Sequence, residues 1–96
     1  VNSRNNFGQT SLSFAAESGC EEIVKMLLDT SKVDINLSDN TGRTPLSYAA
    51  REGHMGIVSL LCDKHTTDIN LGDKKGFSPF MWAVWRGHKE VANVLL

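Results

Sequence analysis

The chain has 96 residues, of which 41% are hydrophobic and 22% are charged, and its formal net charge is −1. This composition is ordinary for a globular protein and supplies no excess of basic residues to hold nucleic-acid phosphates. The longest apolar runs, such as residues 81–85, are far too short to cross a membrane. We therefore expect neither a nucleic-acid partner nor a membrane partner.

The sequence repeats itself at intervals of 34 residues. Five columns keep this spacing: Gly8, Gly42 and Gly76; Ala15, Ala49 and Ala83; Gly19, Gly53 and Gly87; Ile23, Ile57 and Val91; Leu27, Leu61 and Leu95. A period of this length indicates an array of stacked supersecondary units. We expect the tail of a preceding unit at residues 1–3, units at residues 4–37 and 38–71, and a partial unit at residues 72–96, all within a fragment of a longer chain.

The first half of each unit is expected to form a tight turn followed by a short helix. Asp39 and Gly42 stand at the first and fourth positions that a type I turn favours. A hydroxyl side chain after the turn can cap the free amides of a helix, and a glycine can end that helix in the left-handed conformation. The expected caps are Thr10, Thr44 and Ser78, and the expected ends are Gly19, Gly53 and Gly87.

A second helix is expected in the other half of each unit. In the middle unit, Ile57, Val58 and Leu61 recur at helical spacing and form a wide apolar stripe. The first helix has a narrower apolar face, where the small residues Ala49 and Ala50 allow another helix to approach closely. Such a unit cannot bury its apolar face alone, so the sequence predicts an all-α solenoid of helix-turn-helix units.

Three segments of the middle unit carry a recognisable pattern. Residues 44–50 read Thr-Pro-Leu-Ser-Tyr-Ala-Ala, which resembles the T-P-L-H-x-A-A signature of the ankyrin repeat family. Residues 53–61 resemble the glycine, histidine and aliphatic stripe of the family's second helix, and residues 68–70 resemble its D-V-N. The resemblance covers the whole chain. It implies L-shaped units with short β-hairpin-like turns, a curved stack and a concave face that binds proteins.

The sequence departs from the family pattern at the motif histidine, which is Ser13, Ser47 and Met81 in the three units. The hydrogen bonds that this histidine makes between units are therefore expected to be reduced or absent. The loop after the second helix is one residue longer than usual, which accounts for the period. The serine–aromatic pair in the first two units is similar to the ankyrin arrays of fungal receptor-like proteins.

In ankyrin arrays the partner usually meets the tips of the turns and the exposed side of the first helices. For each polar residue at such a place, a simply solvated position is the alternative to a binding role. Mapped by position, the candidate protein-binding residues are Phe7, Gln9, Glu17, Asn40, Thr41, Arg43, Arg51, Glu52, Met55, Lys75, Phe77, Trp85, Arg86 and Lys89.

Phe77 and Trp85 are harder to explain as solvated positions. The other two units carry polar or charged residues at the same places, so the fold does not require an apolar side chain there. An exposed tryptophan beside Arg86 has the composition of an interface hot spot. The alternative is that Trp85 covers a neighbouring repeat.

The aromatic residues Phe14, Tyr48 and Trp82 form a column at the repeat spacing. The spacing places one ring above another between stacked helices. We expect this column to serve packing and not ligand binding.

Catalytic and metal-binding chemistry finds no support in the sequence. Cys20, His54 and His88 are equivalent residues of successive units, so they should lie about 8–10 Å apart. One zinc ion needs its ligands at about 2.0–2.3 Å, and bonding to the adjacent turn is the expected role of these loop residues. Cys62 replaces leucine and should be a small buried hydrophobic residue. We expect no enzymatic activity, no cofactor, no metal and no small-molecule substrate.

One candidate modification site follows from the resemblance. Leu28 together with residues 34–36, Asp-Ile-Asn, resembles the site that asparagine hydroxylases modify in ankyrin proteins. Asn36 is therefore a candidate substrate of such an enzyme. The alternative is a structural role in which its amide holds the backbone.

The sequence thus predicts a non-catalytic interaction module that binds another protein or another domain of the same chain. A structural spacer or a self-inhibitory arm of a larger protein is the alternative. The two cysteines follow no disulfide pattern, which favours a cytoplasmic location with the nucleus also open.

Overall fold

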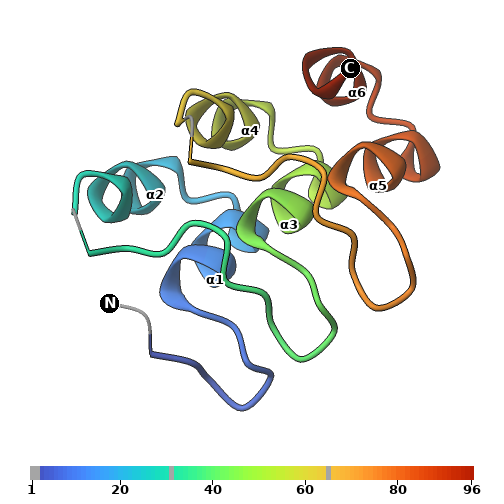
Figure 1. Cartoon of the computed structure of the whole chain (residues 1–96). Helices are drawn as coiled ribbons and strands as arrows, with labels where there is room; N and C mark the ends of the chain where they lie inside the picture. Colours follow the sequence, from blue (N-terminus) through green and yellow to red (C-terminus); the bar gives the residue numbers. More distant parts are fainter. Residues whose placement is uncertain (1–2, 31, 65) are drawn as a thin grey trace.

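The computed structural model describes residues 3–30, 32–64 and 66–96. Within these residues the chain forms six helices, namely α1 (Ser11–Ser18), α2 (Glu21–Leu28), α3 (Pro45–Glu52), α4 (Met55–Cys62), α5 (Pro79–Arg86) and α6 (Lys89–Leu95). Helices α1, α3 and α5 form an inner row, and α2, α4 and α6 form an outer row (Figure 1). The predicted all-α solenoid of helix-turn-helix units is confirmed.

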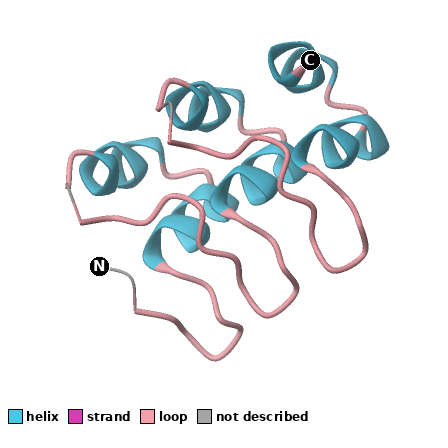
Figure 2. Ribbon diagram, viewed as in Figure 1, coloured by secondary structure: helices cyan, strands magenta, loops and turns pink. Residues whose placement is uncertain are grey.

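Three loops project beyond the inner row as fingers, each directly before an inner helix (Figure 2). A backbone hydrogen bond across its base closes each finger like a hairpin, although the only β-bridge among the described residues joins Arg4 and Thr10. Further backbone bonds join each finger to the next. The closing bonds run from the Asn5 amide to the Gln9 carbonyl, from Asp39 to Arg43 and from Asp73 to Phe77, each 2.9 Å long.

The ends of the inner helices follow the predicted chemistry. The side chains of Thr10, Thr44 and Ser78 each accept a hydrogen bond from the backbone amide three residues later. Pro45 and Pro79 occupy the first turn, where a missing amide hydrogen costs nothing. These caps fix where each finger ends and where each inner helix begins.

The core lies between the two rows and between successive helix pairs. Ala49, Ala50, Ile57 and Val58 of the middle pair have no exposed surface, because this pair packs on both neighbours. Ile23 is the counterpart of Ile57 in the first pair, yet nearly half of its surface is exposed. Burial therefore comes from stacking and not from the single helix pair.

A contact between a glycine and a histidine links successive pairs. Gly53 ends α3 with φ at 77°, and a methyl group added to it would lie 2.7 Å from the His88 ring. The His88 Nε2 atom also donates a hydrogen bond of 3.1 Å to the Arg51 carbonyl. His54 lies in the same way against the glycine that ends α1. Stacking therefore needs a residue without a side chain at this point.

We expect Gly53→Ala to destabilise the protein more than Gly87→Ala. Both glycines are in the left-handed region, with φ of 77° and 76°, so alanine strains the backbone equally at either position. Only at Gly53 does the new methyl group also meet a histidine ring, whereas nothing lies within 4 Å at Gly87. Overpacking of this kind costs about 1–3 kcal/mol.

Urea denaturation followed by circular dichroism measures this difference. Equal losses of unfolding free energy in the two variants would show that the histidine does not pack on the glycine in solution.

Candidate protein-binding surface

The shape of each finger is set by one side chain at its base. In the second finger, Asp39 Oδ1 accepts hydrogen bonds from the backbone amides of Thr41 at 2.9 Å and Arg43 at 3.0 Å. The same pair of bonds runs from Lys75 and Phe77 to Asp73, and from Phe7 and Gln9 to Asn5.

The second carboxylate oxygen of each aspartate binds an aromatic side chain of the inner row. The Tyr48 hydroxyl donates to Asp39 Oδ2, and the Trp82 indole donates to Asp73 Oδ2 at 2.9 Å. These hydrogen bonds fix both rings against the inner row, where they are buried. Phe14 has no donor to offer, and its ring is 57% exposed. The predicted packing role of the aromatic column is thus confirmed for Tyr48 and Trp82 and wrong for Phe14.

An arginine fills the space between the two buried rings. The guanidinium carbon of Arg43 lies 5.8 Å from the centroid of Tyr48 and 4.9 Å from that of Trp82, and its Nε atom lies 3.8 Å from Asp73 Oδ2. Arg51 approaches the same Trp82 ring at 5.2 Å. Cation–π contacts therefore join the second unit to the third. The rings do not stack directly on each other.

The third unit carries a continuous apolar surface. Phe77 packs between Trp82, with centroids 4.9 Å apart, and Trp85, with centroids 6.3 Å apart. Trp85 is nevertheless 71% exposed. Met81 and Val84, which sequence reasoning missed, are also exposed although their counterparts in the other units are small and buried. A hollow of about 240 Å³ is lined by Phe77, Phe80, Met81, Val84 and Trp85.

The first unit has a different character. The Gln9 side chain donates from Nε2 to Glu17 Oε1 at 2.9 Å, and its own oxygen accepts a bond of 3.0 Å from Asn5 Nδ2. Gln9 is only 6% exposed. The prediction that it lies on the exposed surface is therefore wrong, because its amide bridges two neighbouring polar side chains.

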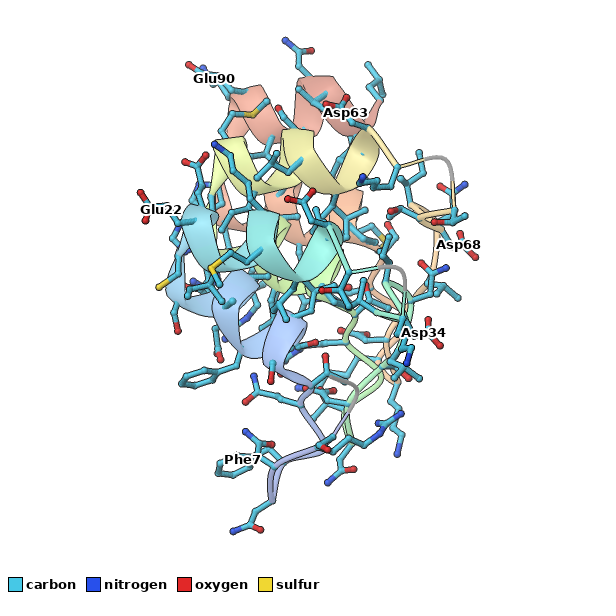
Figure 3. All side chains as sticks on the ribbon, turned by 90° about the vertical axis from the view of Figure 1, so that its left-hand side faces the viewer. Phe7, Glu22, Asp34, Asp63, Asp68 and Glu90 are labelled. Atoms are coloured by element: carbon cyan, nitrogen blue, oxygen red, sulfur yellow. The ribbon has the colours of Figure 1, made fainter. Side chains whose placement is uncertain are left out.

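The other candidate residues lie on the fingers or the inner row, except Met55 and Lys89, which begin the outer helices α4 and α6, and none of them is fully buried. Phe7 stands at the tip of its finger (Figure 3). Phe7, Asn40, Thr41, Lys75, Trp85, Arg86 and Lys89 are exposed, whereas Glu17, Arg43, Arg51, Glu52, Met55 and Phe77 are half-buried.

The two histidines His54 and His88 contact the adjacent unit. The His54 Nε2 atom donates a bond of 3.0 Å to the Glu17 carbonyl, as His88 does one unit later. The expected bonding to the adjacent turn is therefore confirmed for these two histidines. Among the described residues, no three His, Cys, Asp or Glu side chains lie close enough to hold a metal ion.

Cys62 is half-buried and packs against the core. Burial, with a smaller contribution from the negative charge of Asp63, raises the pKa of this thiol. A raised pKa keeps the sulfur protonated and unreactive at neutral pH. The residue therefore behaves as the hydrophobic side chain that the sequence predicted, although its burial is only partial.

Asn36 uses both ends of its amide to hold the next loop. Its Nδ2 atom donates to the Thr66 carbonyl at 2.7 Å, and its Oδ1 atom accepts from the Asp68 amide at 2.8 Å. Asp34 and Asp68 stand one above the other at this edge of the stack (Figure 3). These bonds give Asn36 a structural role.

The charge state of the two finger aspartates is set by their hydrogen bonds. Burial alone would raise the pKa of Asp39, but the hydroxyls of Tyr48 and Thr41 and two backbone amides outweigh it and lower the pKa. Burial of Asp73 is likewise outweighed by two backbone amides, the Trp82 indole and Arg43, so its pKa is also lowered. Both carboxylates are charged at neutral pH.

We expect the protein to lose stability as the pH falls below about 4. A carboxyl whose folded pKa lies below its unfolded value of about 3.9 stabilises the fold above that value, and this stabilisation disappears as the pH falls through the folded pKa. Asp39→Asn should cost about 1–3 kcal/mol at pH 7, because it disrupts a buried hydrogen-bond network, and it should flatten the acid part of the stability curve.

Urea titrations between pH 3 and pH 7 test this expectation. The exposed residue Asp63 provides the control, since Asp63→Asn removes the same charge and should change the unfolding free energy by less than about 0.5 kcal/mol. Identical pH profiles for the two variants would contradict the assigned role of Asp39.

The comparison with known proteins agrees with the geometry. None of the described helices has the length and apolar character that a membrane span requires. No curated protein matches the chain. A family model described as ankyrin repeats, in three copies, matches residues 12–96. Paired helices, projecting fingers and a matching family model together show that this chain belongs to the ankyrin repeat family, whose members generally bind proteins.

Proposed function

We propose that this chain is a non-catalytic protein-binding module whose concave surface meets another protein or another domain of the same chain. The concave surface is formed by the fingers and the solvent-facing side of α1, α3 and α5. Its residues differ from one unit to the next, whereas several residues that pack between the units, such as Ala15, Ala49 and Ala83, are the same in all three. Such a division suits a scaffold that keeps its fold and varies its contacts.

The observation that carries the proposal is the exposed indole of Trp85. It lies edge-on to Phe77 at 6.3 Å, on a surface where the first two units carry Glu17 and Arg51. Aromatic and arginine side chains in such clusters dominate the binding energy of many interfaces. A structural spacer does not require an exposed aromatic side chain on one face, so Trp85 favours a binding role over a spacer role.

The cellular location and the modification of Asn36 are secondary points. Cys20 and Cys62 are both free thiols, which supports our proposal of an intracellular location. The amide of Asn36 donates one hydrogen bond to the next loop and accepts one from it. These bonds support the structural role of Asn36 over its modification by an asparagine hydroxylase.

We expect Trp85→Ala to abolish most partner binding. Truncation of a central hot-spot residue costs about 2 kcal/mol or more, which is roughly a thirtyfold loss of affinity. The immobilised chain and its variant are exposed to native extract, the retained proteins are identified by mass spectrometry, and the affinity of each is measured.

Met26→Ala is the matched control, because Met26 is an equally exposed apolar residue on the outer helix α2. Partners of the concave surface should survive this change. Proteins whose binding falls equally in both variants bind by non-specific hydrophobic contact. Partners retained by Trp85→Ala would show that the concave aromatic surface is not the binding site.

A further inference from the structure

We propose that the hollow between the first two fingers binds a lysine or arginine side chain of the partner. The proposal rests on the proposed concave binding surface and adds the chemistry of one contact to it. The hollow has a volume of about 420 Å³, within the range of small ligand sites. Its aromatic members are Phe7, Phe14 and Tyr48, and its charged members are Glu17, Asp39 and Arg43.

The rings of Phe7 and Phe14 give the hollow an affinity for cations, whereas the Tyr48 ring is already approached by Arg43 at 5.8 Å. Phe7 is 71% exposed at the tip of the first finger, and Phe14 is exposed on α1. The face of an aromatic ring attracts an ammonium or guanidinium group placed within about 6 Å of its centre. Neither ring is needed for stacking, since both are largely exposed while the core residues of the same unit are buried.

The carboxylate of Glu17 is fixed in position in the same hollow by a hydrogen bond. Gln9 fixes Glu17 through a bond of 2.9 Å to Oε1, and Asn5 fixes Gln9 in turn at 3.0 Å. The second oxygen of Glu17 has no hydrogen-bond partner among the described side chains, so it is available to a ligand. A held carboxylate loses little freedom on binding, and its bond to a cation is of the strong, charge-assisted kind.

The other charges of the hollow are already engaged. Asp39 is occupied by Tyr48, Thr41 and two backbone amides. Arg43 pairs with Asp73, since its Nε atom lies 3.8 Å from Asp73 Oδ2. Its guanidinium carbon lies 4.9 Å from the centroid of the Trp82 ring. The charge left to recognise a ligand is therefore the negative charge of Glu17.

The polar chain from Asn5 through Gln9 to Glu17 occurs in the first unit alone. At the places of Gln9 and Glu17, the second unit has two arginines and the third has Phe77 and Trp85. Because the same fold is built three times with different residues at these places, stacking does not explain the chain of hydrogen bonds. Recognition of a cationic group explains this chain of hydrogen bonds.

The test uses small probes and so does not need the natural partner. N-acetyl-arginine amide, N-acetyl-lysine amide with a free side-chain amine, and the neutral N-acetyl-norleucine amide are titrated into the ¹⁵N-labelled chain, and amide shifts are followed by NMR. We expect the two cationic probes to shift the amides of Phe7, Gln9, Phe14 and Glu17, with millimolar affinity. The norleucine probe should bind at least about fivefold more weakly, as expected for loss of one ionic contact.

Glu17→Gln is the decisive variant, and Glu22→Gln on the exposed start of α2 is its charge-matched control. Glu17→Gln should weaken the arginine probe about fivefold, whereas Glu22→Gln should leave its affinity unchanged. The NMR spectrum itself verifies that each variant is folded. Equal effects of the two variants, or equal binding of the norleucine probe, would overturn the proposal.

The result of the probe titration does not depend on whether the concave surface binds a partner through Trp85. If Trp85→Ala abolishes partner capture but the cationic probes do not bind the hollow, the concave surface stands and its proposed ligand chemistry is wrong. If the probes bind and partner capture is insensitive to Trp85, the hollow stands and the aromatic surface of the third unit is not the binding site.

Discussion

Close packing of each helix pair against the next is the constraint on which this structure depends. A single pair buries only one side of its apolar face, as the exposure of Ile23 beside the full burial of Ile57 illustrates. Close approach needs small residues between the inner helices, which Ala49 and Ala50 supply, and it needs space beside each inner helix end. Gly53 supplies that space, and the ring of His88 fills it. Stability is therefore a property of the stack and not of any unit.

This constraint separates the residues that hold the fold from those that are free to vary. Several positions between the units keep the same residue, as Ala15, Ala49 and Ala83 do, whereas positions on the proposed binding surface change in charge and size from unit to unit. The first unit presents a carboxylate among exposed phenyl rings, the second presents arginines that are partly used for internal contacts, and the third presents an exposed indole. Each of these differences changes the charge or shape of the proposed binding surface without altering the backbone that carries it.

Much of this arrangement could be predicted from the sequence, because it depends on local chemistry repeated at a fixed spacing. Helix caps such as Thr44 and the left-handed glycines follow from backbone geometry alone. The exposure of Phe14 and the burial of Gln9 could not be predicted by equivalence between units. Tyr48 is held down because its hydroxyl reaches Asp39, whereas the ring of Phe14 has no donor. Gln9 is buried by two side-chain bonds that the other units lack. Comparison of equivalent positions cannot predict contacts that occur in one unit alone.

Native-state hydrogen exchange tests the dependence on stacking most directly, because it measures the protection of each helix separately. If neighbouring pairs supply the stability, amides of the middle pair, at Ala49, Ala50, Ile57 and Val58, should exchange most slowly, and those of α1, α2, α5 and α6 should exchange faster. Equal protection of all six helices would be compatible only with a single cooperative core. Slower exchange in an end pair than in the middle pair would contradict the account.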